Sequence, residues 1–366
     1  FETTDYGQHW TQITAGIPQD EYVFVVRQDP ADPKLLFAGT KSTVFVSLNG
    51  GVRWQPLMLN LPHVQVRDIA INTRQGNVVI ATHRRAFWIL DNLTLLEQFS
   101  RQPAAGPHDV EMYTPQTAWL SYAYGSSLSD ENDKTVSTVG TNPPFGATVF
   151  FHVPADYDGK VPVSLSFLDG QGQLIRTFKL HRRDPQTPST SAGGRLTAIA
   201  PGFNRFQWDL RYPEATAVTG YNPPEWWGVS DGPPDSDEGP TIIPGHYTVV
   251  LDYNGETSRR SFEVALDPRL HPAPGALEAR LALGFRIHDA LDTLDRTLNQ
   301  AIILRNRIAA AAAQQRVART RAGAMALAAL NEAIGEGVQL ANHSTEADSM
   351  YEQKLHSRLA YLAGLV

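Results

Sequence analysis

Residues 3–10 read Thr-Thr-Asp-Tyr-Gly-Gln-His-Trp, and residues 47–54 read Ser-Leu-Asn-Gly-Gly-Val-Arg-Trp. Both stretches fit the pattern hydroxyl-x-Asp/Asn-x-Gly-x-x-Trp, and the corresponding positions lie 44 residues apart. Asp and Asn hydrogen-bond to nearby backbone in turns, and Gly adopts backbone conformations that other residues avoid. The pattern therefore predicts two copies of one structural turn, in which a Trp ring is buried as an anchor. The turn residues are Asp5, Gly7, Trp10, Asn49, Gly51 and Trp54.

Strand-like runs flank both turns, and they include Tyr22 to Val26, Leu35 to Ala38 and Val64 to Ile71. A repeat of about 40 to 50 residues is the length of a four-stranded propeller blade. Residues 1–95 are therefore predicted to be about two blades of a β-propeller. Because blades bury their faces against neighbours, this region is not expected to fold alone.

The two turns resemble the Asp-box, or BNR, repeat of sialidase-like and sortilin/Vps10-like β-propellers. Three later stretches, residues 81–91, 201–213 and 244–249, resemble a group of bacterial BNR-repeat proteins often labelled glycosyl hydrolases or sortilin-like proteins. A Gly usually stands in that group where Arg85 or Ala86 stands here. The resemblance covers about residues 3 to 270 and implies the C-terminal part of an exported bacterial protein, with an extracytoplasmic location.

The composition of the chain excludes several kinds of site and partner. The chain has 366 residues, a formal net charge of −7 and no cysteine. A disulfide framework, a thiolate metal site and a Cys nucleophile are thereby excluded. The sequence has no stripe of basic residues that would predict nucleic-acid binding. It also has no apolar run long enough to span a bilayer. The first residue, Phe1, falls inside a predicted blade, which we interpret as a processed or truncated product of a longer chain.

The character of the sequence changes twice after Asp91. Residues 96–111 are predicted to be a linker, because Pro103 and Pro107 interrupt a stretch of little periodicity. Residues 112–268 contain short alternating runs with Gly- and Pro-rich turns, which predict an immunoglobulin- or fibronectin-like β-sandwich. Within one run, alternation places Phe206 and Trp208 on the core face, with Arg205 or Arg211 pairing with Asp209 at the surface.

The last part of the chain, residues 275–366, is rich in Ala, Leu and Arg. Apolar residues recur at helical spacing from Ile287 to Ile308, and two further helical stretches follow. Helices with one apolar stripe must bury it, so a small antiparallel bundle is expected. The complete fold class is thus mainly β with an α-helical C-terminal region: a partial propeller, a sandwich and a bundle.

Two groups of residues are candidates for a site. The first is a polar group formed by His83, Arg84 and Asp91 at the edge of the last blade, although a structural turn role is favoured. The second is a loop in which Tyr221, Trp226 and Trp227 can stack on sugar rings. The alternative for this loop is an insertion that packs its aromatic residues on the protein. The nearby carboxylates match no EF-hand, so no metal site is predicted.

No catalytic set stands out, and no cofactor motif is present. A glycosidase needs two facing carboxylates, and Asp68, Asp91 or Asp109 each supply at most one. The first function hypothesis is a non-catalytic part of an exported propeller protein that binds or scaffolds a protein chain, the remaining blades or a cell-surface carbohydrate. The alternative is part of a glycoside hydrolase whose active site lies on other blades.

Overall fold

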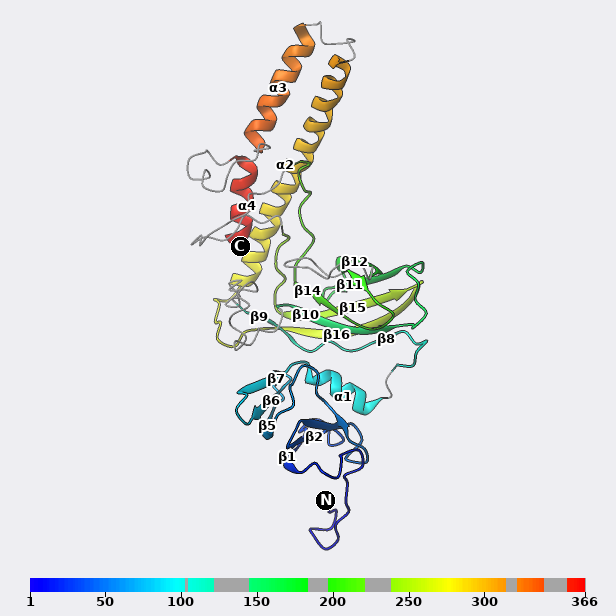
Figure 1. Ribbon diagram of the computed structural model, residues 1–366. Helices are drawn as coiled ribbons and strands as arrows, with labels where there is room; N and C mark the ends of the chain where they lie inside the picture. Colours follow the sequence, from blue (N-terminus) through cyan, green and yellow to red (C-terminus); the bar gives the residue numbers. More distant parts are fainter. Residues whose placement is uncertain are drawn as a thin grey trace. The chain divides into compact units, whose positions relative to one another are not determined.

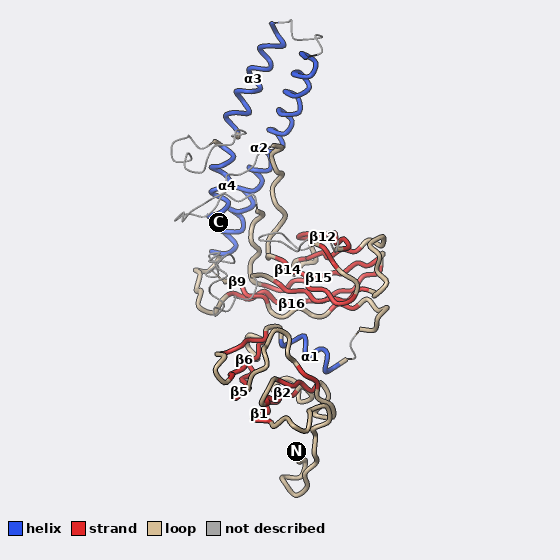
Figure 2. The backbone as a smooth tube through the Cα atoms, viewed as in Figure 1, coloured by secondary structure: helices blue, strands red, loops and turns tan. Residues whose placement is uncertain are grey.

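The computed structural model describes residues 1–102, 105–121, 145–183, 197–220, 238–313, 321–338 and 354–365. It is mainly β, with helices concentrated in the C-terminal region, which confirms the predicted class (Figures 1 and 2). The chain divides into two compact units. Unit 1 comprises residues 1–209 and 244–267, and unit 2 comprises residues 210–243 and 268–366. Among the described helices, none is both long and apolar enough to cross a membrane.

The first sheet of unit 1 contains four antiparallel strands in chain order. They are β1 (Val23–Gln28), β2 (Leu36–Thr40), β3 (Val44–Ser47) and β4 (Gln55–Pro56). β1 is therefore an edge strand, and a bulge between Val23 and Val25 interrupts its register with β2. The second repeated turn follows β3 directly, so the turn chemistry of Asn49 begins where the strand ends.

The second sheet contains three antiparallel strands, again in chain order. They are β5 (Val66–Asn72), β6 (Asn77–Thr82) and β7 (Phe87–Leu90). Each sheet turns one apolar face toward the other, because Val25, Phe37 and Val44 share one buried cluster with Ile69 and Val78. Burial of branched and aromatic side chains on these inner faces is the main stabilising term of this region.

Helix α1 (Leu93–Arg101) follows β7 and occupies the first part of the segment predicted to be a linker. The expectation of an irregular linker is therefore wrong for residues 96–101. Leu93 is fully buried and Leu96 packs beside it in the cluster shared by the two sheets. These two residues lie three positions apart on one face of the helix. The apolar stripe is too short to stand out in the sequence, and tertiary packing makes it helical.

Nine further strands of unit 1 form two sheets, of three and six strands. The three-stranded sheet has the order β14-β10-β8, and the six-stranded sheet has the order β13-β12-β11-β15-β16-β9. The strands are β8 (Glu111–Met112), β9 (Ala118–Leu120), β10 (Ala147–Val153), β11 (Val163–Leu168), β12 (Leu174–Arg182), β13 (Ala198–Ile199), β14 (Gly202–Trp208), β15 (Gly245–Tyr253) and β16 (Glu256–Leu266). Asn254-Gly255 forms the β15–β16 hairpin turn, as its sequence predicts.

Aromatic residues join these two sheets face to face. Trp208 of β14 is fully buried and stacks on Phe167 of β11, with ring centroids 4.3 Å apart. Phe206 is also buried and its ring contacts those of Phe167 and Phe178. The predicted core face of this strand is therefore confirmed. The ion pair that the structure gives for Arg211 is with Glu238, at 3.1 Å, rather than the surface pair expected with Asp209.

Unit 2 is built on one long helix, α2 (Ala276–Ala313), which contacts α3 (Arg321–Gly337) and α4 (Leu355–Leu365). Leu298 and Ile302 of α2 pack against Ile334 of α3, and Val218 from the preceding extended segment joins the same cluster. Asn299 fixes that segment by accepting a hydrogen bond from the backbone N–H of Thr219, at 2.7 Å. The unit therefore includes residues 210–220 and 238–243, which the sequence analysis assigned to the sandwich.

Candidate functional site

The two repeated turns have the same hydrogen bonds. Thr3 Oγ1 donates to Asp5 Oδ1 at 2.9 Å, and Ser47 Oγ donates to Asn49 Oδ1 at 3.0 Å. The same two side-chain oxygens then accept backbone N–H groups four residues onward, from His9 and Arg53, each at 2.9 Å. Hydrogen bonds from His9 lower the pKa of Asp5. The bond from the His9 backbone N–H has the largest effect, followed by the bond from the His9 side chain. These atoms are engaged in closing the turns.

The two Trp residues of the turns differ in burial. Trp54 is buried, and its indole N–H donates to the carbonyl oxygen of Ile13 at 2.7 Å. Trp10 is 60% exposed, and its indole N–H donates to Gly7 within its own turn. The expected burial of the ring is therefore correct for Trp54 and wrong for Trp10. The reason is tertiary, because the segment from Ile13 to Ile17 lies on the second turn and has no described counterpart on the first.

Each of the first two sheets has an apolar outer face, opposite the shared core. On the first sheet, Val26, Ala38 and Phe45 form one cross-strand row. Ala38 and Phe45 are buried with Trp54, whereas Val26 is 51% exposed. Tyr22 and Phe24 extend this uncovered edge, and their rings contact each other edge to face at 5.4 Å. We call the exposed Tyr22, Phe24 and Val26 the first outer face.

The second sheet repeats this arrangement on its own outer side. Ala81 pairs with Phe87, and Val79 pairs with Ile89, while Trp88 and Leu90 point toward the core. Phe87 is 75% exposed and Ile89 is 61% exposed. We call Phe87 and Ile89, with Val79 and Ala81 beside them, the second outer face. Exposed apolar side chains that cluster in this way mark interaction surfaces more often than scattered ones do.

Charged groups from β5 and from the turn after β2 border the first outer face. The Arg67 guanidinium lies 4.4 Å from the centre of the Phe24 ring, and Lys41 Nζ lies 5.8 Å from the centre of the Tyr22 ring. On the same pair of edge strands, Arg27 forms a 2.6 Å ion pair with Asp68. Exposed aromatic rings can also bind cationic groups of a partner through cation–π interactions. The sequence analysis missed this cluster, because Arg67 and Phe24 are distant in the chain.

The predicted polar group of His83, Arg84 and Asp91 does not form one site. His83 and Arg84 are exposed in the turn before β7, and Asp91 follows the end of that strand. A strand of this length separates them by roughly 13 Å. Burial raises the pKa of Asp91, and the charge of Arg205 offsets only part of this. Ala86 in the same turn has φ 56°, a left-handed conformation that Gly adopts more readily than Ala.

The candidate carboxylates for glycoside hydrolysis are also apart. Asp68 pairs across the sheet with Ala81, which pairs with Phe87, four residues before Asp91. Strand spacing places Asp68 and Asp91 roughly 16 Å from each other. That distance exceeds the separation in either retaining or inverting enzymes. Asp109 is engaged locally, since its Oδ2 accepts the backbone N–H of Gly106 at 2.7 Å.

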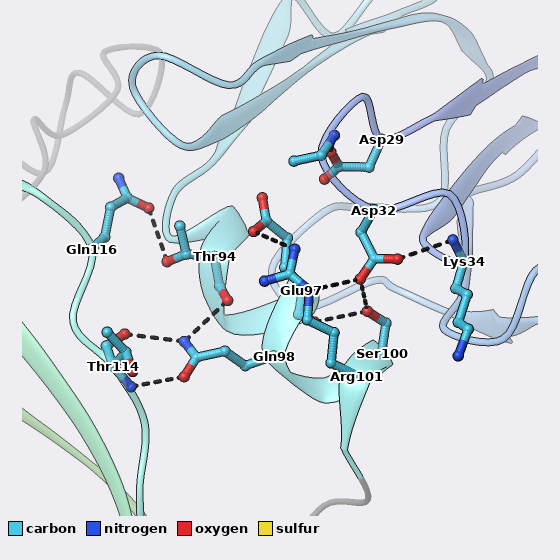
Figure 3. A network of polar contacts seen from close by, with 11 residues as sticks. Asp29, Asp32, Lys34, Thr94, Glu97, Gln98, Ser100, Arg101, Thr114 and Gln116 are labelled. Carbon is cyan, nitrogen blue, oxygen red and sulfur yellow. Dashed lines mark hydrogen bonds and ion pairs between the residues drawn. The ribbon is translucent and has the colours of Figure 1, made fainter. Parts of the chain in front are cut away.

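A polar network surrounds α1 in unit 1 (Figure 3). From the β1–β2 turn, Asp29 and Asp32 approach the helix, and both are buried. Arg101 contacts Asp32 at 3.2 Å and Glu97 at 3.3 Å, and the Ser100 hydroxyl donates to Asp32. On the other side of α1, the Gln98 side chain bonds both backbone groups of Thr114, which precedes β9.

The pKa values of Asp32 and Glu97 shift in opposite directions. Burial opposes ionisation of Asp32, but hydrogen bonds from Ser100 and the Lys34 backbone, with the charge of Arg101, lower its pKa. Burial raises the pKa of Glu97, and the nearby Asp29 carboxylate raises it further. One oxygen of Asp29, Oδ2, is buried without a hydrogen-bond partner. The network therefore clamps α1 to the first sheet and holds one carboxyl that resists ionisation.

Replacement of Glu97 by Gln is expected to remove part of the pH dependence of stability. The folded-state pKa of Glu97 lies above its ordinary value of 4.5, so the folded protein holds this proton more strongly than the unfolded chain. The stability that Glu97 contributes is therefore fully present below pH 4.5 and is lost as the pH rises through the raised pKa. The measurement is the difference in unfolding temperature, Glu97→Gln minus wild type, from pH 4 to 7.5.

That difference should grow more positive with pH, because the neutral amide has no proton to lose. Glu256→Gln, at an exposed hairpin position, is the matched control and should give a flat difference. An unchanging difference for Glu97→Gln across the same range would show that its carboxyl titrates alike in the folded and unfolded chain.

The predicted stacking loop with Tyr221, Trp226 and Trp227 lies outside the described residues. Within the described ranges, no group of three or more His, Cys, Asp or Glu side chains is placed to hold a metal ion. The structure therefore offers, as candidate sites in unit 1, the two outer faces and the α1 network.

Comparisons with known proteins add little to this. No protein-family model and no curated protein matches the chain. One solved structure, described as the extracellular domain of a hybrid two-component system from B. thetaiotaomicron, is similar over 68% of this chain with 9% identity and a TM-score of 0.17. The match covers 26% of that protein's chain, and a TM-score this low carries no argument.

Proposed function

We propose that residues 1–91 are two blades of an Asp-box β-propeller and that the chain is a non-catalytic binding and scaffolding part of an exported bacterial protein. The observation that carries the proposal is the pair of apolar outer faces on either side of one shared core. A blade in a propeller buries both faces against its neighbours. Here each sheet buries one face, and the other remains available to a further sheet.

The repeat itself indicates what covers these faces. The second turn is covered by the Ile13 to Ile17 segment, whose carbonyl oxygen accepts the Trp54 indole N–H. The first turn has the equivalent hydrogen bonds from Thr3 and His9 to Asp5, yet its Trp10 bonds to Gly7 within the turn and is exposed. The expected occupant is thus another β-sheet of the same kind, from further blades or another chain. Full burial of Phe87 and Ile89 would contribute roughly 1.5–3 kcal/mol for each side chain.

The remaining strands of unit 1 support a docking role in this proposal. We interpret β8 to β16 as an immunoglobulin- or fibronectin-like sandwich, because two mainly antiparallel sheets enclose the Phe167 and Trp208 core. Sandwiches of this kind present loops on a rigid scaffold and serve as binding modules in many proteins. A cell-surface carbohydrate is the second class of partner that is consistent with this interpretation.

A glycoside hydrolase remains the alternative, and Asp91 is the observation in its favour. A carboxyl group whose pKa is raised by burial is what a general acid requires. Its partner carboxylate would have to come from elsewhere, since Asp68 lies roughly 16 Å away by strand spacing. Incubating the full chain with a glycan array distinguishes the two functions, because retention without cleavage supports binding and cleavage supports the enzyme. Lack of retention on any glycan or envelope preparation would count against carbohydrate as the partner.

The outer-face proposal predicts a specific effect of charge. Phe87→Asp combined with Ile89→Asp should sharply reduce the fluorescence of a bound apolar dye such as ANS, because it places two carboxylates on the second outer face. The unfolding temperature should change by less than about 3 °C, since exposed substitutions stay within about 0.5 kcal/mol each. Leu174→Asp, at a 62% exposed Leu on β12, is the control and should leave dye binding unchanged.

Two outcomes would contradict the proposal. Unchanged dye fluorescence in the double variant would mean that this face does not attract apolar ligands. A large fall in the unfolding temperature would mean that Phe87 and Ile89 are core residues rather than a surface.

A further inference from the structure

A small polar hollow lies in unit 2, beside the second to fourth turns of α2. Its charged and titratable lining consists of Arg211 and Glu238 from the 210–243 segment and Arg280 and His288 from the helix. Leu281 and Ala363 supply apolar walls. The cavity measures about 20 Å³, enough for one or two oxygen-sized atoms. Nothing in the sequence analysis pointed to it, because its residues come from three separate stretches.

The spacing along α2 creates this hollow. Arg280, Gly284 and His288 are four residues apart in succession, so they lie in one row on one face of the helix. Gly284 is the middle member, and it lines the cavity. It has no side chain, so it leaves a gap between Arg280 and His288, which lie two turns, about 12 Å, apart along the helix axis. Gly costs about 1 kcal/mol relative to Ala in a helix interior, so the gap opposes the local helix preference.

Two groups that border the gap, His288 Nε2 and the Arg280 guanidinium, have no hydrogen-bond or ion-pair partner among the described residues. His288 Nε2 is buried and has no hydrogen-bond partner in the described part of the chain, while Nδ1 lies 3.4 Å from Asp289 Oδ1. Arg280 makes no ion pair with any described residue. The Arg211 guanidinium is already held, by Glu238 at 3.1 Å and by the Gly239 carbonyl oxygen at 3.1 Å.

The two guanidinium groups of the hollow differ in their partners. Arg211 forms an ion pair with Glu238, whereas Arg280 has no ion-pair partner among the described residues. A monoanion with two coplanar oxygen atoms fits both the size of the cavity and the fork of a guanidinium.

We propose that this hollow is a binding site for a carboxylate group, held by Arg280 and by the Nε2–H form of His288. The guanidinium donates two charge-assisted hydrogen bonds to the carboxylate, and the imidazole donates one. The ligand class is a small carboxylate or the acidic side chain of a peptide. The site is independent of the outer faces of unit 1, so it stands whether or not those faces bind other sheets.

Titration of the full chain with acetate tests the proposal, followed by the NMR signals of the His288 ring at constant ionic strength. We expect a saturable shift, with affinity lowered at least tenfold in Arg280→Gln and in Gly284→Ala. The second variant fills the gap with a methyl group while favouring the helix. Arg286→Gln, which removes an exposed charge from the same helix, should change the affinity less than twofold.

Chloride and inorganic phosphate serve as the other arms of the experiment. Competition by phosphate alone would reassign the site to a larger oxyanion and overturn the carboxylate class. No saturable shift, or equal binding by wild type, Arg280→Gln and Gly284→Ala, would overturn the site. Should Gly284→Ala lose its helical circular dichroism, the Arg280→Gln result decides, because that side chain is only partly buried.

Discussion

A fragment of residues 1–91 is expected to show no cooperative thermal unfolding. Ending the chain at Asp91 removes α1 and with it Leu93, a fully buried member of the core shared by the two sheets. It also removes Ser100 and Arg101, which bind the Asp32 carboxylate. Both outer faces stay exposed, and a two-sheet unit buries too little apolar surface to offset its conformational entropy. The measurement is thermal unfolding by circular dichroism at several concentrations.

The fragment of residues 1–102 is the matched comparison, because it restores α1. It should hold more β-structure than the shorter fragment at low temperature, since Leu93 and Leu96 again cover the core. The full chain should unfold cooperatively under the same conditions. A sharp, concentration-independent transition of the 1–91 fragment as a monomer would contradict the expectation and would show that two sheets suffice.

Replacement of Trp208 by Ala is expected to have the largest effect of any single substitution in unit 1. The side chain is fully buried between the two sheets, stacks on Phe167 at 4.3 Å and contacts Tyr247 and Phe262 edge to face. Truncation of a buried Trp costs about 3–5 kcal/mol, through lost burial and the cavity left behind. For a unit of this size, that is a fall of roughly 6–20 °C in the unfolding temperature.

Two further variants serve as comparisons for Trp208→Ala. Trp208→Phe keeps a ring in the stack, so it should lose less than half of the stability that Trp208→Ala loses. Phe87→Ala truncates an aromatic residue that is 75% exposed and should lie within about 0.5 kcal/mol of wild type. If Trp208→Ala were no more destabilising than Phe87→Ala, the ring would not be part of the core between the sheets.

Much of the fold could be predicted because its signals are local. The two turns are determined by residues at fixed short offsets, and Asp5 and Asn49 make equivalent hydrogen bonds 44 residues apart. The strand of Phe206 and Trp208 was predicted from alternation alone, because a half-buried strand has a period of two. The helical region followed from apolar spacing in the same way.

The candidate sites could not be predicted to the same extent, because they depend on distant contacts. His83 and Asp91 are close in sequence, but β7 holds them at opposite ends of a strand. Arg67 and Phe24, or Arg211 and His288, are far apart in sequence and meet only within one sheet pair or one helical unit. Helix α1 was missed because its stripe consists of two leucines, and their burial depends on the core already assembled by both sheets.

The sequence by itself determined the repeated turns, the main strands, the C-terminal helices and the mainly β class. Each of these follows from hydrogen bonds and side-chain periodicity within a few residues. Only the tertiary structure decided which of the two similar turns buries its Trp and which sheet faces stay exposed. It also decided where the hollow beside Gly284 forms. The physical reason is that burial depends on which other segment lies against a residue, and no local pattern specifies that segment.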